Sequence, residues 1–163
     1  MSLVTAILPT TGRVAISQAI KNLTAHLAIG RGNAVWTTPP VPSVSATGLI
    51  DEIARRRATE IGYVIPSPTG DIITPNGAYV RTATVTRFLY FRFAFETSEA
   101  LGQTIREQAI FLNTTLAVGV SESTFYLLPA QVASQGLMLV LQNSAPIVRS
   151  PTTRNFYEHV ISF

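Results

Sequence analysis

The sequence predicts a β-rich α+β fold, an antiparallel sheet or sandwich of about seven strands with two short helices. Apolar and polar residues alternate with period two along much of the chain, which is typical of half-buried strands. Glycine-containing turn sequences, SPTGDI and TPNGAY, interrupt the central part of the chain. The spacing of an amphipathic helix occurs in two short stretches, and both precede residue 58.

The length of the chain indicates one domain. We expect residues 1–163 to form a single domain, because no repeat, low-complexity segment or linker divides them. A chain of this length buries about two thirds of its unfolded surface, which is enough for a core. Cysteine is absent, which excludes disulfides, thiolate metal sites and a cysteine nucleophile.

The first helix is expected after the segment ILPTTG. Its apolar positions have the i, i+3, i+4, i+7 spacing of one helical face. These positions are Ile16, Ala19, Ile20 and Leu23. Thr10 or Thr11 is available as the N-cap, and the helix should end near Asn22 or Leu23.

A strand and a loop should follow this helix. The segment LTAHLAIG, residues 23–30, has the composition of a strand. The next segment, residues 31–45, is rich in proline and holds the only tryptophan, Trp36. We therefore expect a loop between the first strand and the second helix.

The second helix is expected in TGLIDEIARRR, residues 47–57. Four apolar residues share one face of this helix. They are Leu49, Ile50, Ile53 and Ala54. Asp51 and Glu52 would occupy the first turn, and the arginine run 55–57 would occupy the last one. This distribution of charge complements the helix dipole, which favours acids at the N-terminus and cations at the C-terminus.

From residue 59 the pattern becomes that of strands. Residues 59–66 alternate with period two up to Pro66, and the turn sequences that follow contain Gly70 and Gly77, which can adopt positive φ. The segment RFLYFRFAFET, residues 87–97, is a strand with a core face and a half-covered face. The core face consists of Leu89, Phe91, Phe93 and Phe95, and the other of Phe88, Tyr90, Arg92, Ala94 and Glu96.

Four further strands complete the prediction. They are expected at TIREQAIFLN (104–113), TFYLL (124–128), LMLVLQN (137–143) and RNFYEHVISF (154–163). The last of these alternates up to the final residue, which is typical of a chain end that is paired into a sheet.

Two opposite charges, Arg106 and Glu107, stand inside the expected strand 104–113. Neighbouring residues of a strand point to opposite faces, so each face carries one charge. We interpret the two as structural ion-pairing residues. At least one should be buried and salt-bridged, with Arg106 paired to an acid such as Glu96 on the neighbouring strand.

The composition predicts that neighbouring proteins cover much of the surface. Charged residues make up 13% of the chain, roughly half the usual ~25%, whereas apolar residues make up 47%. No charged residue lies between Glu122 and Arg149. An independent soluble protein ordinarily keeps more charge on its surface.

The predominance of arginine over lysine argues against nucleic acid as a partner. The net charge of +3 comes from eleven arginines, one lysine and nine acids, which is a small imbalance for a nucleic-acid binder. Arginine without lysine is typical of ion pairs that are buried or lie in interfaces. We expect no nucleic-acid partner and no membrane partner, since the uncharged run contains proline, glutamine and asparagine and never reaches the length of a membrane span. The N-terminus lacks the basic region of a signal peptide, so synthesis in the cytoplasm is expected.

No motif for chemistry is found. His26 and His159 belong to no metal-ligand spacing. GVSES, residues 119–123, lacks the second glycine of a nucleophile elbow, and the glycines at 30 and 32 lack the third glycine and the helix of a dinucleotide site. No two acids are marked as a catalytic pair. We therefore predict no enzyme activity, no catalytic residue, no metal and no cofactor.

The candidate residues are contacts to other proteins. They are Trp36, Arg55, Arg56, Arg57, Tyr126 and the uncharged segment 123–144. Each has another reading that the sequence leaves open. Trp36 would then fill the core, the arginines would end a helix in solvent, and the uncharged segment would supply core strands.

Five segments in a fixed order, together with the end of the chain, carry a resemblance to a known family. They are LPTTGRVAISQAI, AHLAIGRGNAVW, LIDEIARRRATEIGYVIP, FLYFRFAFE and GQTIREQAIFLNT. In this order the chain resembles small bacteriophage tail proteins of the tail-collar and tail-fibre N-terminal type. The end of the chain, IVRSPTTRNFYEHVISF, is similar to stand-alone members from myophages and Mu-like phages.

The resemblance implies a structural virion protein at the distal tail or baseplate. In fibre proteins of this type a shaft and a receptor-binding tip follow the domain, and here they do not, which favours an adaptor between baseplate and tail fibre or a fibre-base component. The partners would be the baseplate wedge, the tail fibre and further copies of the chain. The alternative is a carbohydrate-binding module for the host receptor at the tail tip, and a third hypothesis is a small cell-wall hydrolase.

Overall fold

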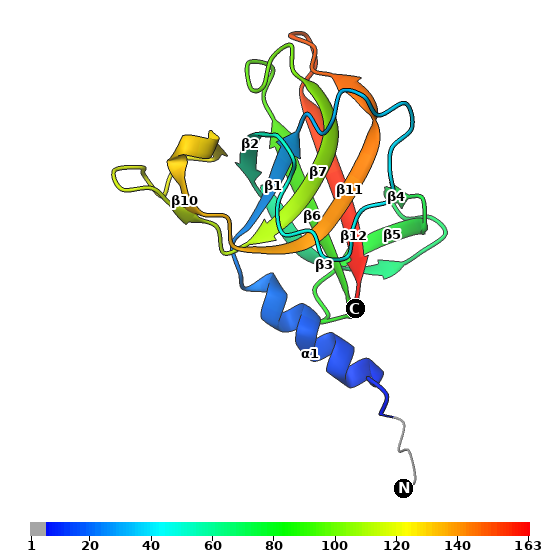
Figure 1. The fold of residues 1–163 in the computed structure, drawn as a ribbon. Helices are drawn as coiled ribbons and strands as arrows, with labels where there is room; N and C mark the ends of the chain where they lie inside the picture. The colour runs from blue at the N-terminus through cyan, green and yellow to red at the C-terminus, as the bar shows by residue number, and fades with distance from the viewer. Residues whose placement is uncertain (1–5) are drawn as a thin grey trace, which may run out of the picture. The chain divides into compact units, whose positions relative to one another are not determined.

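The computed structural model describes residues 6–163 and shows a β-rich fold with antiparallel sheets (Figure 1). The fold class is thus confirmed, but the numbers differ, because these residues form twelve strands in three sheets and one α-helix. The elements are α1 (Thr10–Lys21), β1 (Ala25–Gly30), β2 (Glu52–Arg57), β3 (Glu60–Pro66), β4 (Ile72–Thr74), β5 (Gly77–Thr82), β6 (Phe88–Phe95), β7 (Thr104–Leu112), β8 (Thr115–Leu116), β9 (Tyr126–Leu127), a 3-10 turn (Pro129–Gln131), β10 (Val132–Ser134), β11 (Leu137–Val148) and β12 (Asn155–Ser162).

The strands form two five-stranded sheets and one two-stranded sheet. One five-stranded sheet has the order β11-β7-β1-β2-β9, and the other has the order β12-β6-β3-β5-β4. Strands β8 and β10 form a two-stranded sheet. In the first sheet β1 runs antiparallel to both neighbours, and β11 runs antiparallel to β7 along almost its full length (Figure 1). Strands β11 and β9 are the edges of this sheet.

Helix α1 confirms the first expected helix, but not its cap or its buried face. Pro9 stands at the N-cap position without a side-chain hydrogen bond, so neither Thr10 nor Thr11 caps the helix. Ser17 is the one buried residue of α1, and its hydroxyl donates a hydrogen bond to the Thr86 carbonyl. Ile16 remains exposed. The apolar spacing therefore does not mark a face that is buried within the chain.

The second expected helix is wrong, because residues 52–57 form strand β2. The arginine run pairs with β1, with Arg55 opposite Ala28 and Arg57 opposite His26. Ile53, Ala54 and Arg55 are all buried. Pairing with a buried strand on one side and with β9 on the other satisfies the backbone groups, and this long-range pairing overrides the local helical pattern.

The expected strands are otherwise confirmed, and the additional ones are mostly short. Of the strands that the sequence did not predict, β4, β8 and β10 have three residues or fewer, and β5 pairs with β4 across the predicted turn at Gly77. Gly77 has a φ of +127°, as expected. Gly70 is required for a different reason, because a Cβ there would lie 2.2 Å from the Tyr79 carbonyl oxygen.

Strand β6 is more deeply buried than expected. The predicted core face, Leu89 to Phe95 in steps of two, is completely buried. On the other face Tyr90 and Ala94 are buried as well, whereas Phe88 and Arg92 are half-buried. The expectation of a half-covered second face therefore holds for part of it only.

The chain divides into two compact units. Of the described residues, the first contains 6–23, 60–92 and 158–163, and its core is formed by Val64, Ile72, Tyr79 and Tyr90 with Phe88 and Val160 packed against them. The second contains residues 24–59 and 93–157. One core cluster of the second unit is formed by Ala28, Ala109 and Phe111 with Leu49, Met138 and Leu141. All candidate contact residues belong to the second unit.

Gly136, which leads into β11, should be intolerant of substitution. Its φ is +78°, and a Cβ would lie 2.1 Å from the Leu112 carbonyl oxygen. Gly136→Ala should therefore lower the free energy of unfolding by about 2 to 3 kcal/mol. Gly119 is the matched control, because its φ of +87° is similar but nothing lies near its Cβ position. Urea unfolding should show a loss of only about 1 kcal/mol for Gly119→Ala, and equal losses in the two variants would contradict this account.

Candidate interaction surface

Arg55 is buried and fully engaged inside the second unit. Its guanidinium donates two hydrogen bonds to the Glu52 carboxylate, at 2.6 and 2.9 Å, and one each to the Thr114 hydroxyl and the Gln135 carbonyl. The guanidinium carbon lies 4.0 Å from the centre of the Phe111 ring. With 1% of its surface exposed, Arg55 offers no contact to a partner and acts as a structural cation.

The other two arginines of the run are half-buried. Arg56 forms an ion pair with Glu99, and Arg57 donates a hydrogen bond to the Glu122 carbonyl. Both guanidinium groups lie 5.7 Å from the centre of the Phe125 ring. Tyr126 is also half-buried, and its hydroxyl accepts a hydrogen bond from the backbone N–H of Ala100. Burial raises the pKa of Tyr126.

Arg149 is a structural residue that the sequence analysis missed. It is 2% exposed and donates hydrogen bonds to the carbonyl groups of Glu96 and Glu99 and to the Asn155 side chain. Its guanidinium lies 5.8 Å from the centre of the Phe95 ring. The signal available in the sequence was its position as the first charge after a long uncharged run.

Arg106 and Glu107 are neighbours in β7, and the expected ion pair of Arg106 with Glu96 is not formed. Arg106 donates a hydrogen bond to the Arg31 carbonyl at 3.3 Å. Glu107 is 2% exposed, and its carboxylate accepts a hydrogen bond from the Ile50 N–H at 3.1 Å. Glu96 is paired with Arg56 and Arg154 instead. Within residues 6–163, neither Arg106 nor Glu107 belongs to an ion pair.

Trp36 is half-buried in the proline-rich loop. Its ring packs on Gly32, since a Cβ at that glycine would lie 2.7 Å from the ring. Gly32 has a φ of +58°, which also favours glycine. Trp36 thus lies on the inner side of the loop, where it lines a cavity rather than filling the core.

The loop and β11 together form a surface without charge, which we name the uncharged surface. It comprises residues 32–50 and 137–148, and neither segment contains Asp, Glu, Lys, Arg or His. The loop lies along β11, and the Asn143 side chain donates a hydrogen bond to the Pro40 carbonyl (Figure 1). Several of its apolar side chains are more than 60% exposed. They are Val35, Val41, Val44, Ile50, Leu137 and Val148.

The structure also distinguishes two readings of the uncharged segment 123–144. If this segment supplied core strands, most of its apolar side chains would be buried. Leu127 is its one buried residue, and the others are half-buried or exposed. The segment therefore contributes to the surface of the second unit.

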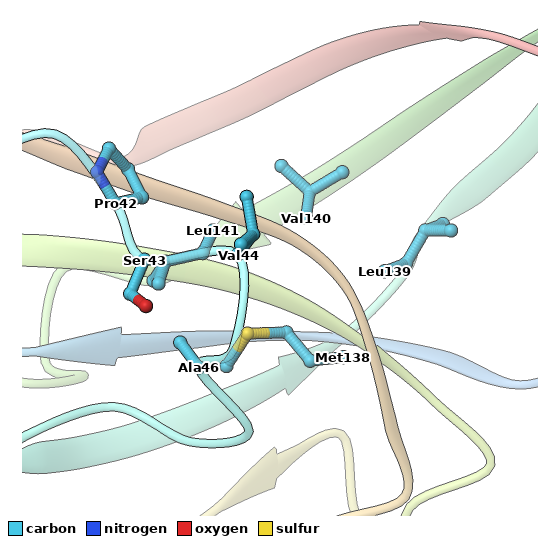
Figure 2. Close-up of a pocket in the computed structure, with 8 residues that line it drawn as sticks. All are labelled: Pro42, Ser43, Val44, Ala46, Met138, Leu139, Val140 and Leu141. Atoms are coloured by element: carbon cyan, nitrogen blue, oxygen red, sulfur yellow. The ribbon is translucent and has the colours of Figure 1, made fainter.

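A hollow lies between the two parts of the uncharged surface. Figure 2 shows loop side chains, among them Pro42 and Val44, together with Met138, Leu139, Val140 and Leu141 of β11. The cavity has a volume of about 270 Å³. A second cavity of about 240 Å³ adjoins it, sharing Ser43, Ala46 and Leu141, and is lined by Trp36 and Glu107.

The described residues supply no metal site or membrane helix. Nowhere in 6–163 do three or more His, Asp or Glu side chains gather as metal ligands would. Over the same range, no helix is long and apolar enough to cross a membrane. His26 is buried in β1 and His159 is half-buried in β12. Burial lowers the pKa of both histidines.

His26 should make the protein sensitive to acid. The pKa of His26 is lowered from 6.5 to about 4. Burial is the largest cause, and the charges of Arg55 and Arg57 contribute less. The unfolded chain therefore binds a proton at His26 in a pH range where the folded chain does not, so stability falls as the pH decreases from 6.5 to 4, by up to about 3 kcal/mol. Urea unfolding between pH 7 and 4.5 measures this loss.

The control separates His26 from His159. In a His159→Gln background, His26→Gln should remove most of the pH dependence above pH 4.5. The His26 Nδ1 atom has no hydrogen-bond partner, so the substitution breaks no hydrogen bond at this atom. An unchanged slope in the double variant would show that other groups cause the acid sensitivity.

Comparison with known proteins gives one family match. A family model described as "Baseplate wedge 3 tail fiber network component" matches residues 5–163. No curated protein matches the chain. The matched range includes the uncharged surface and almost all of both compact units.

Proposed function

The chain belongs to the family of baseplate wedge 3 tail fiber network components, and from this membership we propose that it acts as an adaptor that holds a tail fibre on the baseplate wedge. The membership confirms the expected phage baseplate or tail-fibre protein and makes the chain a structural component of the virion tail. The adaptor role, the several copies in each virion and assembly in the host cytoplasm are parts of the proposal.

The observation that carries the proposal is the uncharged surface. Its exposed valines and leucine lie on two segments that contain no charged residue. Apolar patches of this kind are uncommon on independent monomers and typical of permanent interfaces. In addition, β11 is an edge strand without the lysines or inward-pointing charges that ordinarily keep edges from pairing.

We also propose that the adaptor is not an enzyme and needs no cofactor. In the second unit, the buried side chains of Arg55 and Arg149 serve structural contacts with carboxylate, carbonyl and aromatic groups. Adaptors need matching surfaces instead of reactive groups. We therefore expect the chain to retain a baseplate protein and to turn over no substrate.

A second candidate, a carbohydrate-binding module for the host receptor, is favoured by one observation. Trp36 and Asn143 line the same cavity, and sugar sites combine an aromatic ring with amide and carboxylate groups. This function requires that a free sugar compete with the receptor for binding. Binding of host polysaccharide that is lost in Trp36→Ala would favour it over the adaptor.

The experiment for the adaptor is capture of its partners. Light scattering first gives the oligomeric state of the purified chain. Immobilised chain should then retain the baseplate wedge and tail-fibre proteins of the same particle, since one surface must meet each of them. A monodisperse monomer that retains neither protein would contradict the proposal.

A further inference from the structure

One carboxylate lies beneath the uncharged surface without a cation beside it. Glu107 projects from β7, the strand that pairs with β11, and is 2% exposed. Its hydrogen-bond donor is the Ile50 N–H of the loop. No arginine, lysine or histidine of residues 6–163 lies within ion-pair distance. A buried carboxylate in this situation is poorly compensated, because burial removes its water and nothing supplies the opposite charge.

Glu107 faces a cavity of about 240 Å³. The cavity is lined by Trp36, Pro40, Val41, Ser43, Ala46, Gly48, Ile50, Glu107, Leu141 and Asn143. Glu107 is the one charged residue in this lining, and the remainder is apolar, small or uncharged. The negative charge is therefore concentrated at one point of an otherwise neutral wall.

Asn143 supplies an independent observation. Its Nδ2 atom donates to the Pro40 carbonyl at 3.0 Å, which fixes the orientation of the amide. Its Oδ1 atom is buried and has no hydrogen-bond partner. Buried acceptors of this kind are uncommon and call for a donor that the chain itself does not provide.

We propose that this cavity receives a cationic side chain, arginine or lysine, of a partner protein in the tail. The inference rests on the proposed adaptor function and names the chemistry of its partner. The cation would neutralise Glu107, donate a hydrogen bond to the Asn143 Oδ1 atom and lie near the Trp36 ring, which attracts cations. Arginine and lysine side chains have several donors and no acceptor, which fits a carboxylate and an amide oxygen.

A sugar fits these groups less well. Sugar hydroxyls act as donors and acceptors, and the buried polar atoms of Glu107 and Asn143 that remain open are acceptors only. A neutral ligand would also leave the charge of Glu107 uncompensated. Removal of the Glu107 charge should therefore weaken the binding of a cation, whereas it should not weaken the binding of a sugar.

The test uses Trp36, the single tryptophan, as a fluorescent reporter. The probe is N-acetyl-arginine methylamide, and its uncharged analogue is N-acetyl-citrulline methylamide. The arginine probe should change the emission of Trp36 in a saturable way, and the citrulline probe should not. In Glu107→Gln the affinity for the arginine probe should fall by about tenfold or more, because the charge is lost.

The variants are matched. Glutamine retains an oxygen that accepts the Ile50 N–H, so Glu107→Gln should fold normally, and circular dichroism checks this. Asp71→Asn removes the same charge from an exposed position of the first unit and should leave the affinity unchanged. Equal responses to the two probes, equal affinities in Glu107→Gln and the native chain, or a response to N-acetylglucosamine instead would each overturn the proposal.

Capture of partner proteins separates this inference from the function on which it rests. If Glu107→Gln retains the wedge and fibre proteins as well as the native chain does, the cation pocket is overturned and the adaptor function stands. If the native chain retains neither protein, the adaptor function fails, and the titration alone decides whether the cavity binds a cation.

Discussion

Replacing Arg55 with alanine should lower the free energy of unfolding by about 3 to 5 kcal/mol, the effect of removing one partner from a buried ion pair. The variant would leave the Glu52 carboxylate without its cation, and it would remove the hydrogen bonds that Arg55 donates to the Thr114 hydroxyl and the Gln135 carbonyl. It would also remove the group that packs on the Phe111 ring. Urea unfolding monitored by circular dichroism measures the loss.

Arg57→Ala is the matched control for Arg55→Ala. Arg57 stands two residues further along the same strand and is half-buried. Its guanidinium donates a hydrogen bond to the Glu122 carbonyl and lies 5.7 Å from the centre of the Phe125 ring. Its replacement should cost less than about 1 kcal/mol. Comparable losses in the two variants would mean that Arg55 is not the structural cation described here.

Charges placed on the uncharged surface should abolish capture of the partner without loss of stability. Val44 and Leu137 are both highly exposed, one in the loop and one in β11. The double variant Val44→Asp/Leu137→Asp should weaken binding by roughly 100- to 1,000-fold, about 3 to 4 kcal/mol, because two unpaired charges would enter an apolar interface. Surface plasmon resonance with the partner identified by capture measures the change.

A control variant tests whether the position of the charge matters. Val118 is fully exposed in the second unit but lies outside the uncharged surface. Val118→Asp should bind as the native chain does, and all these variants should unfold at the same urea concentration. Equal weakening by Val118→Asp would point to a general effect of charge.

The sequence was informative where one strand carries its own pattern. Strand β6 has a face formed by Leu89 and three phenylalanines, and β1 and β7 have the composition of strands, so their positions could be predicted without knowledge of their neighbours. Strand β2 could not be predicted in this way. The local sequence of its arginines resembles the end of a helix. In the strand, Arg55 is buried and forms an ion pair with Glu52 and a contact with the Phe111 ring, and these contacts stabilise the extended conformation.

The candidate site shows the same limit. The burial of at least one of Arg106 and Glu107 was predictable, because neighbouring residues of a strand point to opposite faces. The contact of Glu107 with the Ile50 N–H was not, because 57 residues separate the two. Trp36 could be assigned to a loop, whereas its packing on Gly32 depends on the path of that loop. The lack of charge in the segment 123–144 was the feature that indicated a covered surface, and it required no knowledge of pairing.

Cryo-electron microscopy of the assembled tail would show whether the uncharged surface is an interface. We expect another protein of the baseplate or fibre to cover the loop 32–50 and β11, so that no solvent channel reaches Val44 and Leu137. If both segments faced solvent in the particle, the uncharged surface would not be the interface of an adaptor.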